Sequence, residues 1–523
     1  MNRIRQKDAS GVWIVPAVLT LFLTFLIIVP LAAMFLNIDG ESINEVIRRS
    51  EFFSVIGNSV LVSLLTTAIS IVLAYIFAWC VIRTAMPFKK LFRILVIIPM
   101  LIPSISIGMG VVLLLGNNGI VTNIFGFGSD IYGINGIVLG SVLYSLPVAF
   151  LMIENILKFE DSAPYEAANV LGIPAKNRFF AITLPYLKKP MIAVAFSVFT
   201  LSFTDYGVPL MVGGKFKTLP VLMYQEVIGQ LNFGKGCVYG MILLIPAVLA
   251  FVIDLMSKNN SSSSFVIKPF EIKKNTFKDF FAGVYSSALS AFSFLPIVSF
   301  IVLAFVKKYP SDMTFTFENF EKTLRMGGST YLRNSVLIAV LTAAIGVLTA
   351  VLTAYFTART AGKLGKYLHL VAMSTAAIPG IVLGLSYVLL FKGSALYGTL
   401  IILVMVNMVH FFSSPYLMMH TSFSKVNENL ESVASTLGIG KMRLLKDVLI
   451  PKCAHTVGEM FSYFFVNCMM TISAVSFLAN TGTKPISLMI NQFEAQGQLE
   501  FAAAVSIMIL TVNLIMKSVI REK

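Results

Sequence analysis

The sequence predicts an all-α polytopic membrane protein built from two parallel, pseudo-symmetric halves of about six helices each. Hydrophobic residues occupy 57% of the 523 positions and charged residues 12%, and the mean hydropathy is +0.84. Several apolar runs exceed the roughly 18 residues that cross a bilayer as a helix. The chain also repeats itself, because residues 58–84 align with residues 334–360 without a gap. Such an internal repeat predicts two copies of one architecture.

The apolar runs predict twelve membrane-spanning helices with both termini in the cytoplasm. In this topology most of the 40 Lys and Arg residues lie on the cytoplasmic side, as the positive-inside rule requires. The net charge of +15 therefore reflects loops that face anionic lipid, and no nucleic acid is expected as a partner. The expected helices cover residues 12–36, 58–82, 94–115, 135–157, 190–212, 237–256, 280–306, 334–357, 367–391, 398–420, 454–479 and 500–519.

A linker divides the chain into its two halves. The first transmembrane half is expected at residues 1–256 and the second at residues 280–523, and both begin in the cytoplasm. Residues 257–279 are rich in Ser and Asn and then in Lys, which is typical of a cytoplasmic linker. Because repeats of the same orientation are related by an axis along the membrane normal, we expect a pathway along that axis.

A polar segment recurs at equivalent places in the two halves, at residues 166–185 and 432–451. In both copies a Leu-Gly-Ile triplet precedes an aliphatic-X-aliphatic-Pro step by the same distance. Each copy is expected to form a short amphipathic helix that ends at the glycine and cannot bury its own apolar face. Two copies predict docking on a two-fold symmetric cytoplasmic partner; the alternative is a helix that lies on lipid. The expected docking residues are Glu166, Ala167, Ala168, Leu171, Gly172, Ile173, Glu431, Ser432, Ala434, Leu437, Gly438 and Ile439.

The first copy resembles the cytoplasmic loop signature of ABC importer permeases, E-A-A-x3-G-x9-I-x-L-P. Every position of the signature is filled, by Glu166, Ala167, Ala168, Gly172, Ile182, Leu184 and Pro185. In the second copy Ser432 stands at the Glu position directly after Glu431, and Val433 replaces the first Ala. The resemblance covers the whole chain and implies a fused two-half permease of the type I, MetI-like architecture.

The resemblance also implies what the chain works with. The two loops would be coupling helices seated in clefts of a homodimeric ATP-binding subunit, and ATP and Mg would be bound there rather than by this chain. An extracytoplasmic solute-binding protein would deliver the substrate to a permease in the bacterial cytoplasmic membrane. Residues 203–254 resemble the 2-aminoethylphosphonate permeases, so a phosphonate is the expected substrate. Ferric iron is the alternative, followed by polyamine or thiamine.

One stretch approaches a phosphate-binding loop but lacks a required group. Gly229 and Gly234-Lys235 have the spacing of a P-loop, yet Gly236 replaces the Ser or Thr that binds Mg²⁺. No catalytic residue is therefore expected, and ATP hydrolysis is assigned to a separate subunit. A rival class, the ion-coupled secondary transporter, predicts paired ionisable residues in the middle of the membrane and no matching cytoplasmic loops.

Polar residues and helix breakers within the apolar runs are candidates for a translocation path or gate. For Asp205, a role in the pathway and a structural hydrogen bond have equal weight. Prolines and nearby glycines in the expected third and ninth helices are candidate hinges, although kinked packing explains them as well. No metal site is expected, because His410 lacks ligand-type neighbours at a suitable spacing. The candidates are Asp205, Pro103, Gly108, Pro379, Gly384, Asn407 and His410.

Overall fold

The computed structural model confirms an all-α polytopic architecture. Within the described part of the chain the only sheet is a two-stranded antiparallel hairpin of Val306–Lys308 (β1) and Asp312–Phe315 (β2). Much of the predicted linker at 257–279 lies outside the described residues. The structure describes residues 2–126, 131–257, 268, 270–272, 274–359, 362–427 and 429–521.

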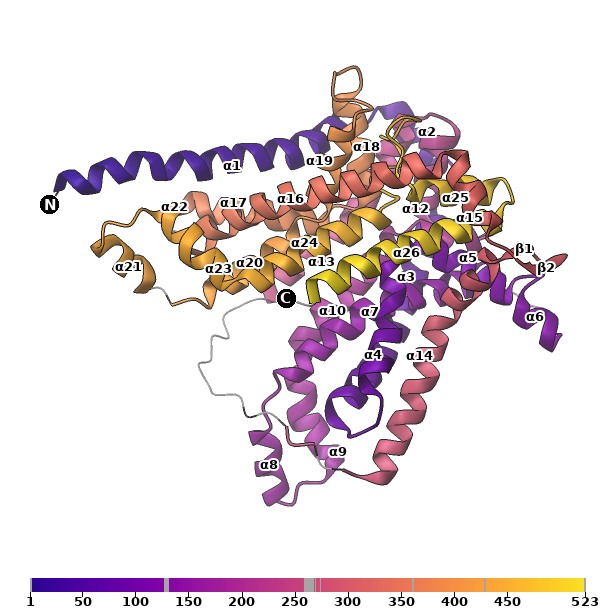
Figure 1. Cartoon of the computed structure of the whole chain (residues 1–523), viewed down its shortest axis with the longest axis horizontal. Coiled ribbons are helices and arrows are strands. Elements are labelled where there is room, and N and C mark those ends of the chain that lie inside the picture. The colour runs from indigo at the N-terminus through magenta and orange to yellow at the C-terminus, as the bar shows by residue number, and fades with distance from the viewer. Residues whose placement is uncertain are drawn as a thin grey trace. The chain divides into compact units, whose positions relative to one another are not determined.

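The chain forms two compact units, and most of their helices are labelled in Figure 1. The first-repeat unit comprises Arg48–Met223 and Ile245–Asn319, and the second-repeat unit comprises Met1–Ile47, Tyr224–Leu244 and Phe320–Lys523. The elements of the first-repeat unit are α3 (Phe52–Arg83), α4 (Lys89–Ile97), η1 (Ile98–Leu101), α5 (Ser104–Leu115), α6 (Ile120–Phe125), α7 (Ile134–Lys158), α8 (Ala163–Val170), α9 (Ala175–Arg178), η2 (Phe179–Thr183), α10 (Leu184–Thr204), α11 (Gly207–Val212), α14 (Thr276–Ala304), β1 and β2.

The second-repeat unit contains the remaining elements, apart from three helices that cross the boundary. Those three are α12 (Leu219–Tyr224), α13 (Phe233–Ser257) and α15 (Glu318–Thr323). The elements within the unit are α1 (Asn2–Leu36), α2 (Gly40–Ile47), η3 (Gln225–Gly229), η4 (Leu324–Gly328), α16 (Ser329–Arg359), α17 (Lys363–Ser374), η5 (Thr375–Ala377), α18 (Gly380–Phe391), α19 (Leu400–His410), α20 (Ser413–Ser424), α21 (Asn429–Thr436), α22 (Lys441–Leu444), η6 (Leu445–Leu449), α23 (Ile450–Lys452), α24 (Ala454–Met470), α25 (Ser487–Ala495) and α26 (Leu499–Arg521).

Each half contributes its first helix to the unit that holds the other half. Helix α1 packs on α17 and α18 (Figure 1), and the Tyr387 hydroxyl donates to the Leu26 carbonyl at 2.8 Å. Helix α14 packs on α3, α4 and α5, and its Tyr285 hydroxyl donates to the Leu73 carbonyl at 2.9 Å. The compact units therefore cut across the halves expected at 1–256 and 280–523, and those boundaries stay a prediction from the sequence repeat.

Fewer continuous spans are found than the twelve expected. Among the described residues, nine helices are long and apolar enough to cross a membrane, or up to eleven if each of two bent pairs counts as one span. The expected span at 454–479 is shorter, because α24 ends at Met470 after 17 residues. The following residues as far as α25 have no long helix.

Prolines break two expected helices at equivalent positions. The expected helix 94–115 is interrupted between η1 and α5, where Ile102 is extended (φ −125°, ψ 152°) before Pro103. The expected helix 367–391 is likewise divided, and its two parts meet at 110° beside Pro379. Proline disfavours the helical conformation in the residue before it and donates no hydrogen bond, so a break is expected at each site.

Two further expected helices are divided without such a clear signal. The expected helix 190–212 stops at Thr204 and resumes as α11 after Asp205 and Tyr206. The expected helix 398–420 consists of α19 and α20, which meet at 54°. Pro415 in the first turn of α20 has no N–H to donate back to the preceding residues, which favours this bend.

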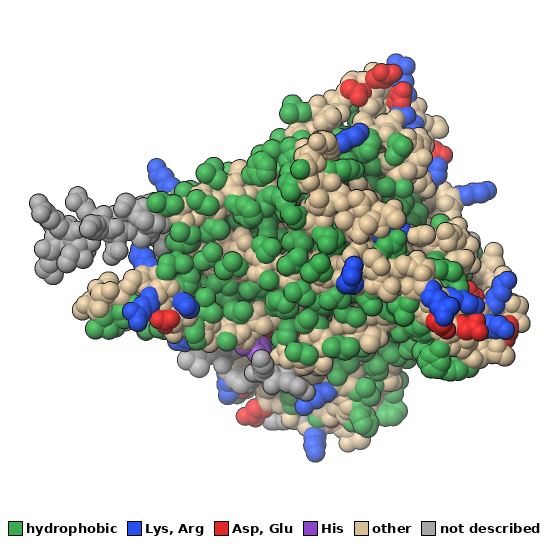
Figure 2. Space-filling view, turned by 45° about the horizontal axis from the view of Figure 1, so that its top comes forward, with side chains coloured by type: hydrophobic (Ala, Val, Ile, Leu, Met, Phe, Trp, Pro, Cys, Tyr) green, Lys and Arg blue, Asp and Glu red, His purple; other side chains and the backbone are tan. Residues whose placement is uncertain are grey.

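Hydrophobic side chains cover large areas of the surface in the view of Figure 2, and Lys, Arg, Asp and Glu side chains gather in a few patches. Inside the first-repeat unit, buried residues of α3, α7 and α10 form one cluster. At its centre the rings of Phe77 and Phe150 meet edge to face, with centroids 4.7 Å apart. An apolar exterior over a packed interior is the arrangement expected of helices that face lipid.

Candidate functional site

The two polar repeats form the same turn. In the first, α8 ends at Gly172 with φ +68°, and the Ile173 amide donates to the Ala168 carbonyl at 3.0 Å. In the second, α21 ends at Gly438 with φ +68°, and the Ile439 amide donates to the Ala434 carbonyl at 2.8 Å. This is the Schellman C-cap, which needs a left-handed residue that glycine adopts without strain. The Leu-Gly-Ile triplet of the sequence therefore encodes one backbone geometry twice.

The turn exposes apolar side chains and buries one small residue. Leu171 is 74% exposed and Leu437 is 67% exposed. The alanines that accept the C-cap bond, Ala168 and Ala434, are only 3% and 5% exposed. A larger side chain at either position would be forced into the packed side of the loop. An exposed apolar patch beside polar residues is typical of a surface that binds another protein.

The remaining predicted docking residues also lie on this turn. Glu166, Ala167 and Ser432 are exposed, and Ile173 is half-buried. Beyond the turn, both copies enter a π-helical segment, η2 or η6, in which the Leu184 amide donates to Phe179 and the Ile450 amide donates to Leu445. A proline follows directly in each copy. Because proline has no amide hydrogen to donate, the helical hydrogen-bond pattern is interrupted at the same place in both loops.

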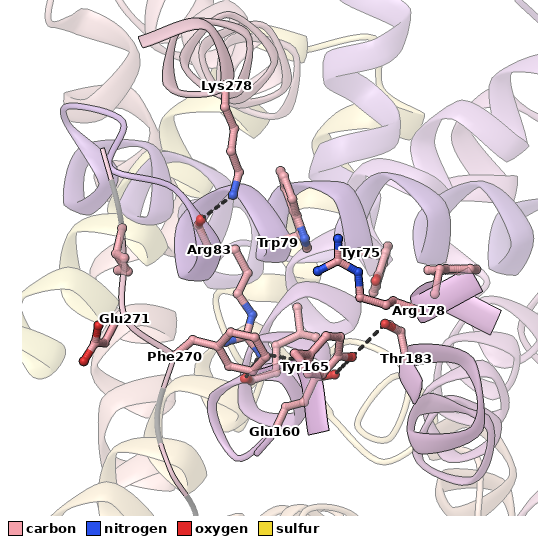
Figure 3. Close-up of a pocket in the computed structure, with 13 residues that line it drawn as sticks. Tyr75, Trp79, Arg83, Glu160, Tyr165, Arg178, Thr183, Phe270, Glu271 and Lys278 are labelled. Carbon is pink, nitrogen blue, oxygen red and sulfur yellow. Dashed lines mark hydrogen bonds and ion pairs between the residues drawn. The ribbon is translucent and has the colours of Figure 1, made fainter. Parts of the chain in front are cut away.

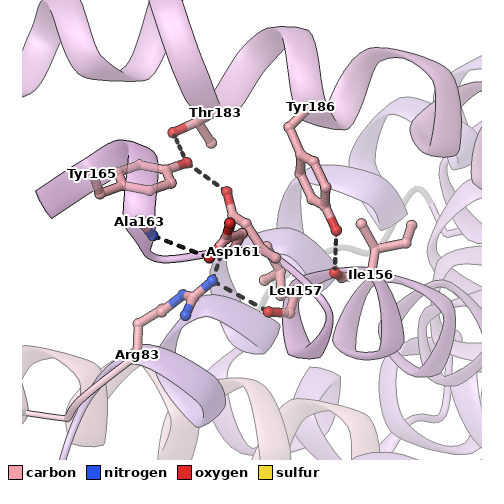
Figure 4. A network of polar contacts seen from close by, with 9 residues as sticks. Arg83, Ile156, Leu157, Asp161, Ala163, Tyr165, Thr183 and Tyr186 are labelled. Carbon is pink, nitrogen blue, oxygen red and sulfur yellow. Dashed lines mark hydrogen bonds and ion pairs between the residues drawn. The ribbon is translucent and has the colours of Figure 1, made fainter. Parts of the chain in front are cut away.

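A buried ion pair anchors the first loop to the ends of α3 and α7 (Figure 4). An Arg83 Nη donates to the Glu160 carboxylate at 2.5 Å and to the Leu157 carbonyl at 3.2 Å. Tyr165, in the first turn of α8, donates its hydroxyl to Glu160 and lies 2.7 Å from the Thr183 hydroxyl. Burial, and then the hydrogen bond to Glu160, raise the pKa of Tyr165, so its hydroxyl stays protonated as a donor.

The second loop uses an equivalent arginine with a different carboxylate. Arg359 aligns with Arg83 in the repeat, and it pairs with Glu431 at 2.5 Å with only 2% of its side chain exposed. The Arg359 guanidinium also donates to the carbonyls of Phe423, Val426 and Asn427. Glu431, predicted as a docking residue, thus forms an ion pair with Arg359 at the base of the loop.

An open hollow of about 550 Å³ lies beside the first loop (Figure 3). Its walls are aromatic side chains from α3, α8, η2 and residue 270, and its basic groups come from α3, α9 and α14. The lining residues are Tyr75, Trp79, Arg83, Leu157, Glu160, Tyr165, Arg178, Phe179, Thr183, Phe270, Glu271, Ile272 and Lys278.

Asp205 caps a helix. Its carboxylate accepts the Val208 amide at 3.0 Å and the Gly207 amide at 3.3 Å, at the start of α11. The Ser104 hydroxyl, at the start of α5, donates to the same carboxylate at 2.6 Å. These bonds join two helix N-termini, which favours the structural reading of Asp205 over a pathway role.

The candidate hinge glycines are sites of close packing. A Cβ added at Gly108 would lie 3.2 Å from the Val208 Cα, and one added at Gly384 would lie 2.7 Å from the Ala474 carbonyl oxygen. Val208 and Ala474 are equivalent in the register that aligns the polar repeats. The absence of a side chain at the two glycines therefore lets the helix after each proline break pack closely against the backbone at Val208 or Ala474.

Asn407 and His410 lie together on α19. The Asn407 amide group donates to the Leu403 carbonyl at 2.8 Å. A Cβ added at Gly380, just after Pro379, would lie 2.8 Å from the His410 Nε2, so this ring covers the break between α17 and α18. In the described part of the chain no three His, Cys, Asp or Glu side chains gather as metal ligands.

Sequence reasoning missed the anchors of the two loops. Arg83 and Arg359 occupy the same position in the ungapped alignment of 58–84 with 334–360. An arginine at the same position of two apolar repeats could have indicated these anchors. The sequence repeat does not indicate their partners, because Glu160 and Glu431 are not equivalent positions in it.

Comparison with known proteins agrees with this architecture. Residues 70–262 match the family described as "Binding-protein-dependent transport system inner membrane component". The chain is 26% identical over 500 residues to the ferric transport system permease protein FbpB of Actinobacillus pleuropneumoniae, covering 90% of this chain and 72% of that protein. It is 21% identical over 476 residues to the Fe(3+)-transport system permease protein FbpB 2 of Haemophilus influenzae, covering 88% and 87%.

A shorter relative matches part of the chain. The spermidine/putrescine transport system permease protein PotC homolog of Mycoplasma genitalium is 26% identical over 227 residues, covering 42% of this chain and 75% of that protein. Residues 70–262 therefore match the MetI-like permease domain, and over most of its length the chain is similar to permeases of binding-protein-dependent importers.

Proposed function

We propose that the chain is the membrane subunit of an ATP-driven ferric iron importer. The choice of ferric iron as substrate rests on sequence similarity. Two proteins named as ferric transport permeases are similar to this chain over 90% and 88% of its length. The expected phosphonate rests on residues 203–254 alone, and none of the relatives named above is a phosphonate permease. Ferric iron, the alternative in the sequence analysis, is therefore the better supported substrate.

The geometry of the two loops supports a separate, two-fold symmetric ATP-binding partner. Gly172 and Gly438 have the same positive φ, and each is followed by the same C-cap hydrogen bond. Two equal surfaces on one chain suit a homodimer, which presents one site twice. ATP and Mg would be bound by that partner, on the cytoplasmic side, where we also expect both termini of this chain.

Coupling would work through movement of the loops. When ATP closes the partner dimer, it draws the two loops together, and their rigid attachment through Arg83 and Arg359 passes the motion to the helices. A buried ion pair suits this role, because separating its charges in a low-dielectric interior costs several kcal/mol. The halves then alternate between inward-facing and outward-facing packing, and hydrolysis resets them.

Reconstitution tests this proposal. The chain is placed in lipid vesicles with its ATP-binding subunit and its extracytoplasmic solute-binding protein, and uptake of radiolabelled Fe(III) is measured with and without ATP. We expect ATP-dependent Fe(III) uptake that 2-aminoethylphosphonate and spermidine do not compete for. ATP-dependent uptake of 2-aminoethylphosphonate without Fe(III) uptake would overturn the substrate and leave the importer assignment in place.

A further inference from the structure

The described part of the linker lies against the base of the first loop. The Ser162 amide donates to the Lys268 carbonyl at 2.9 Å, and the Lys268 amide donates to the Asp161 carboxylate at 3.2 Å. These two bonds hold Lys268 beside the residues that start α8. Main-chain bonds of this kind fix the position of a segment independently of its side chains.

Linker side chains extend the contact onto the helix itself. The Lys268 ammonium donates to the Glu166 carboxylate at 2.6 Å, and this hydrogen bond lowers the pKa of Glu166. The Phe270 ring meets the Tyr165 ring edge to face, with centroids 5.1 Å apart. The Arg83 guanidinium lies 3.2 Å from the centre of the Phe270 ring, and Figure 3 shows this ring next to both Arg83 and Tyr165.

The far end of the linker is attached to the same corner of the unit. The Lys278 ammonium donates to the Arg83 carbonyl at 2.9 Å, and Asp279 accepts the Ala85 amide at 2.8 Å. Arg83 therefore contacts the linker through both its side chain and its backbone, while it also binds Glu160. The ends of α3 and α7, the start of α8 and the start of α14 meet at one polar joint.

We propose that Lys268 and Phe270 are positioning residues for the first coupling helix. They clamp the first turn of α8 at Glu166 and Tyr165, which fixes the angle at which Leu171 is presented. The second helix is held differently, by the Arg359–Glu431 pair within its own repeat. This assignment rests on the proposed coupling role of the loops. It adds that the linker between the two repeats sets the orientation of the first loop.

The strength of the clamp comes from the sum of its contacts. The ammonium of Lys268 and the carboxylate of Glu166 are about half exposed, at 53% and 51%, and exposed ion pairs are individually weak. Lys268→Glu removes the attraction and places a third negative charge beside Glu166 and Asp161. Phe270→Ala removes the ring on which both Arg83 and Tyr165 pack, so the double variant should release α8 more than either change alone.

Hydrogen exchange of the full chain in nanodiscs tests the clamp without any partner. We expect Lys268→Glu to speed amide exchange in residues 163–173 about fivefold, with a larger effect for the double variant and none in residues 429–439. Lys274→Glu is the matched control, because Lys274 is an exposed linker lysine whose side chain makes no hydrogen bond or ion pair with the described residues. Lys268→Arg and Phe270→Tyr should exchange as the wild type does.

The complete transporter then tests positioning against mere local stability. In vesicles with the ATP-binding subunit, we expect the double variant to hydrolyse ATP at a rate near that of the wild type while transporting about fivefold less substrate per ATP. Unchanged exchange in residues 163–173 would overturn the proposal even if coupling through the loops is correct. Faster exchange with an unchanged ratio of transport to hydrolysis would also overturn it. Failure of the loops to bind any ATP-binding subunit would instead overturn the proposed function and leave the exchange result valid.

Discussion

Replacing Gly172 by Asp tests whether the first loop docks on a partner. Gly172 has φ +68°, and no atom lies within 4 Å of a Cβ built there. Asp therefore fits without a clash, and its side chain tolerates the left-handed conformation better than most, so the backbone cost stays below about 1–2 kcal/mol. The loop should keep its shape, and the chain should insert in the membrane normally.

The expected loss comes from the charge. If the bend enters a cleft of the ATP-binding subunit, the carboxylate is buried there without a partner, which costs about 3–5 kcal/mol. This corresponds to roughly 10²- to 10⁴-fold weaker binding. The assay is co-purification of the ATP-binding subunit and ATP-driven uptake in vesicles, at equal amounts of inserted permease.

Gly172→Asn is the matched control, because Asn has nearly the same shape and the same tolerance of a positive φ but no charge. We expect it to keep at least a large part of the uptake. Wild-type uptake by the Asp variant would show that Gly172 does not enter a buried contact, because an unpaired charge buried there would weaken binding. Equal loss in the Asn and Asp variants would show that side-chain volume, rather than charge, is excluded.

The other predictions concern the second loop and the broken helices. Gly438→Asp should also reduce uptake, by no more than Gly172→Asp, and a complete lack of effect would show that the second loop is not a contact. Arg359→Ala should leave Glu431 unpaired and lower the unfolding free energy by about 3–5 kcal/mol, measured by thermal unfolding in detergent. Arg359→Lys should rescue it only in part, since one ammonium cannot replace bonds to three carbonyls; full rescue would contradict this. Asp205→Asn should retain uptake because its one amide oxygen still accepts an amide of α11, whereas Asp205→Ala should cost about 1 kcal/mol of stability; abolished uptake in the Asn variant would give the Asp205 charge a role in the pathway.

The helices themselves were predictable because apolar runs of spanning length have few other stable forms in lipid. Breaks at Pro103 and Pro379 follow from proline chemistry, and both prolines were expected to kink their helices. The end of α24 at Met470 has no such local signal. There Thr471, at the position equivalent to Asp205, starts a non-helical segment whose path depends on packing against Gly384.

The glycine turn of the two loops was the most predictable part of the candidate site, since Gly172 and Gly438 each stand where a positive φ is needed. What the sequence did not show was the direction of individual side chains. Glu431 looked like a docking residue from its place beside the signature, but the carboxylate pairs with Arg359. The sequence also did not predict that α1 packs in the second-repeat unit and α14 in the first-repeat unit, because all the apolar helices have similar surfaces.

We propose that this chain is driven through its two loops by a separate ATP-binding subunit. A cryo-EM map of the chain in lipid nanodiscs, bound to its ATP-binding subunit, tests this most directly. We expect the turns at Gly172 and Gly438 to occupy equivalent clefts of the two ATP-binding subunits. A map with either turn lying in lipid, or on the face opposite the ATP-binding subunits, would contradict it.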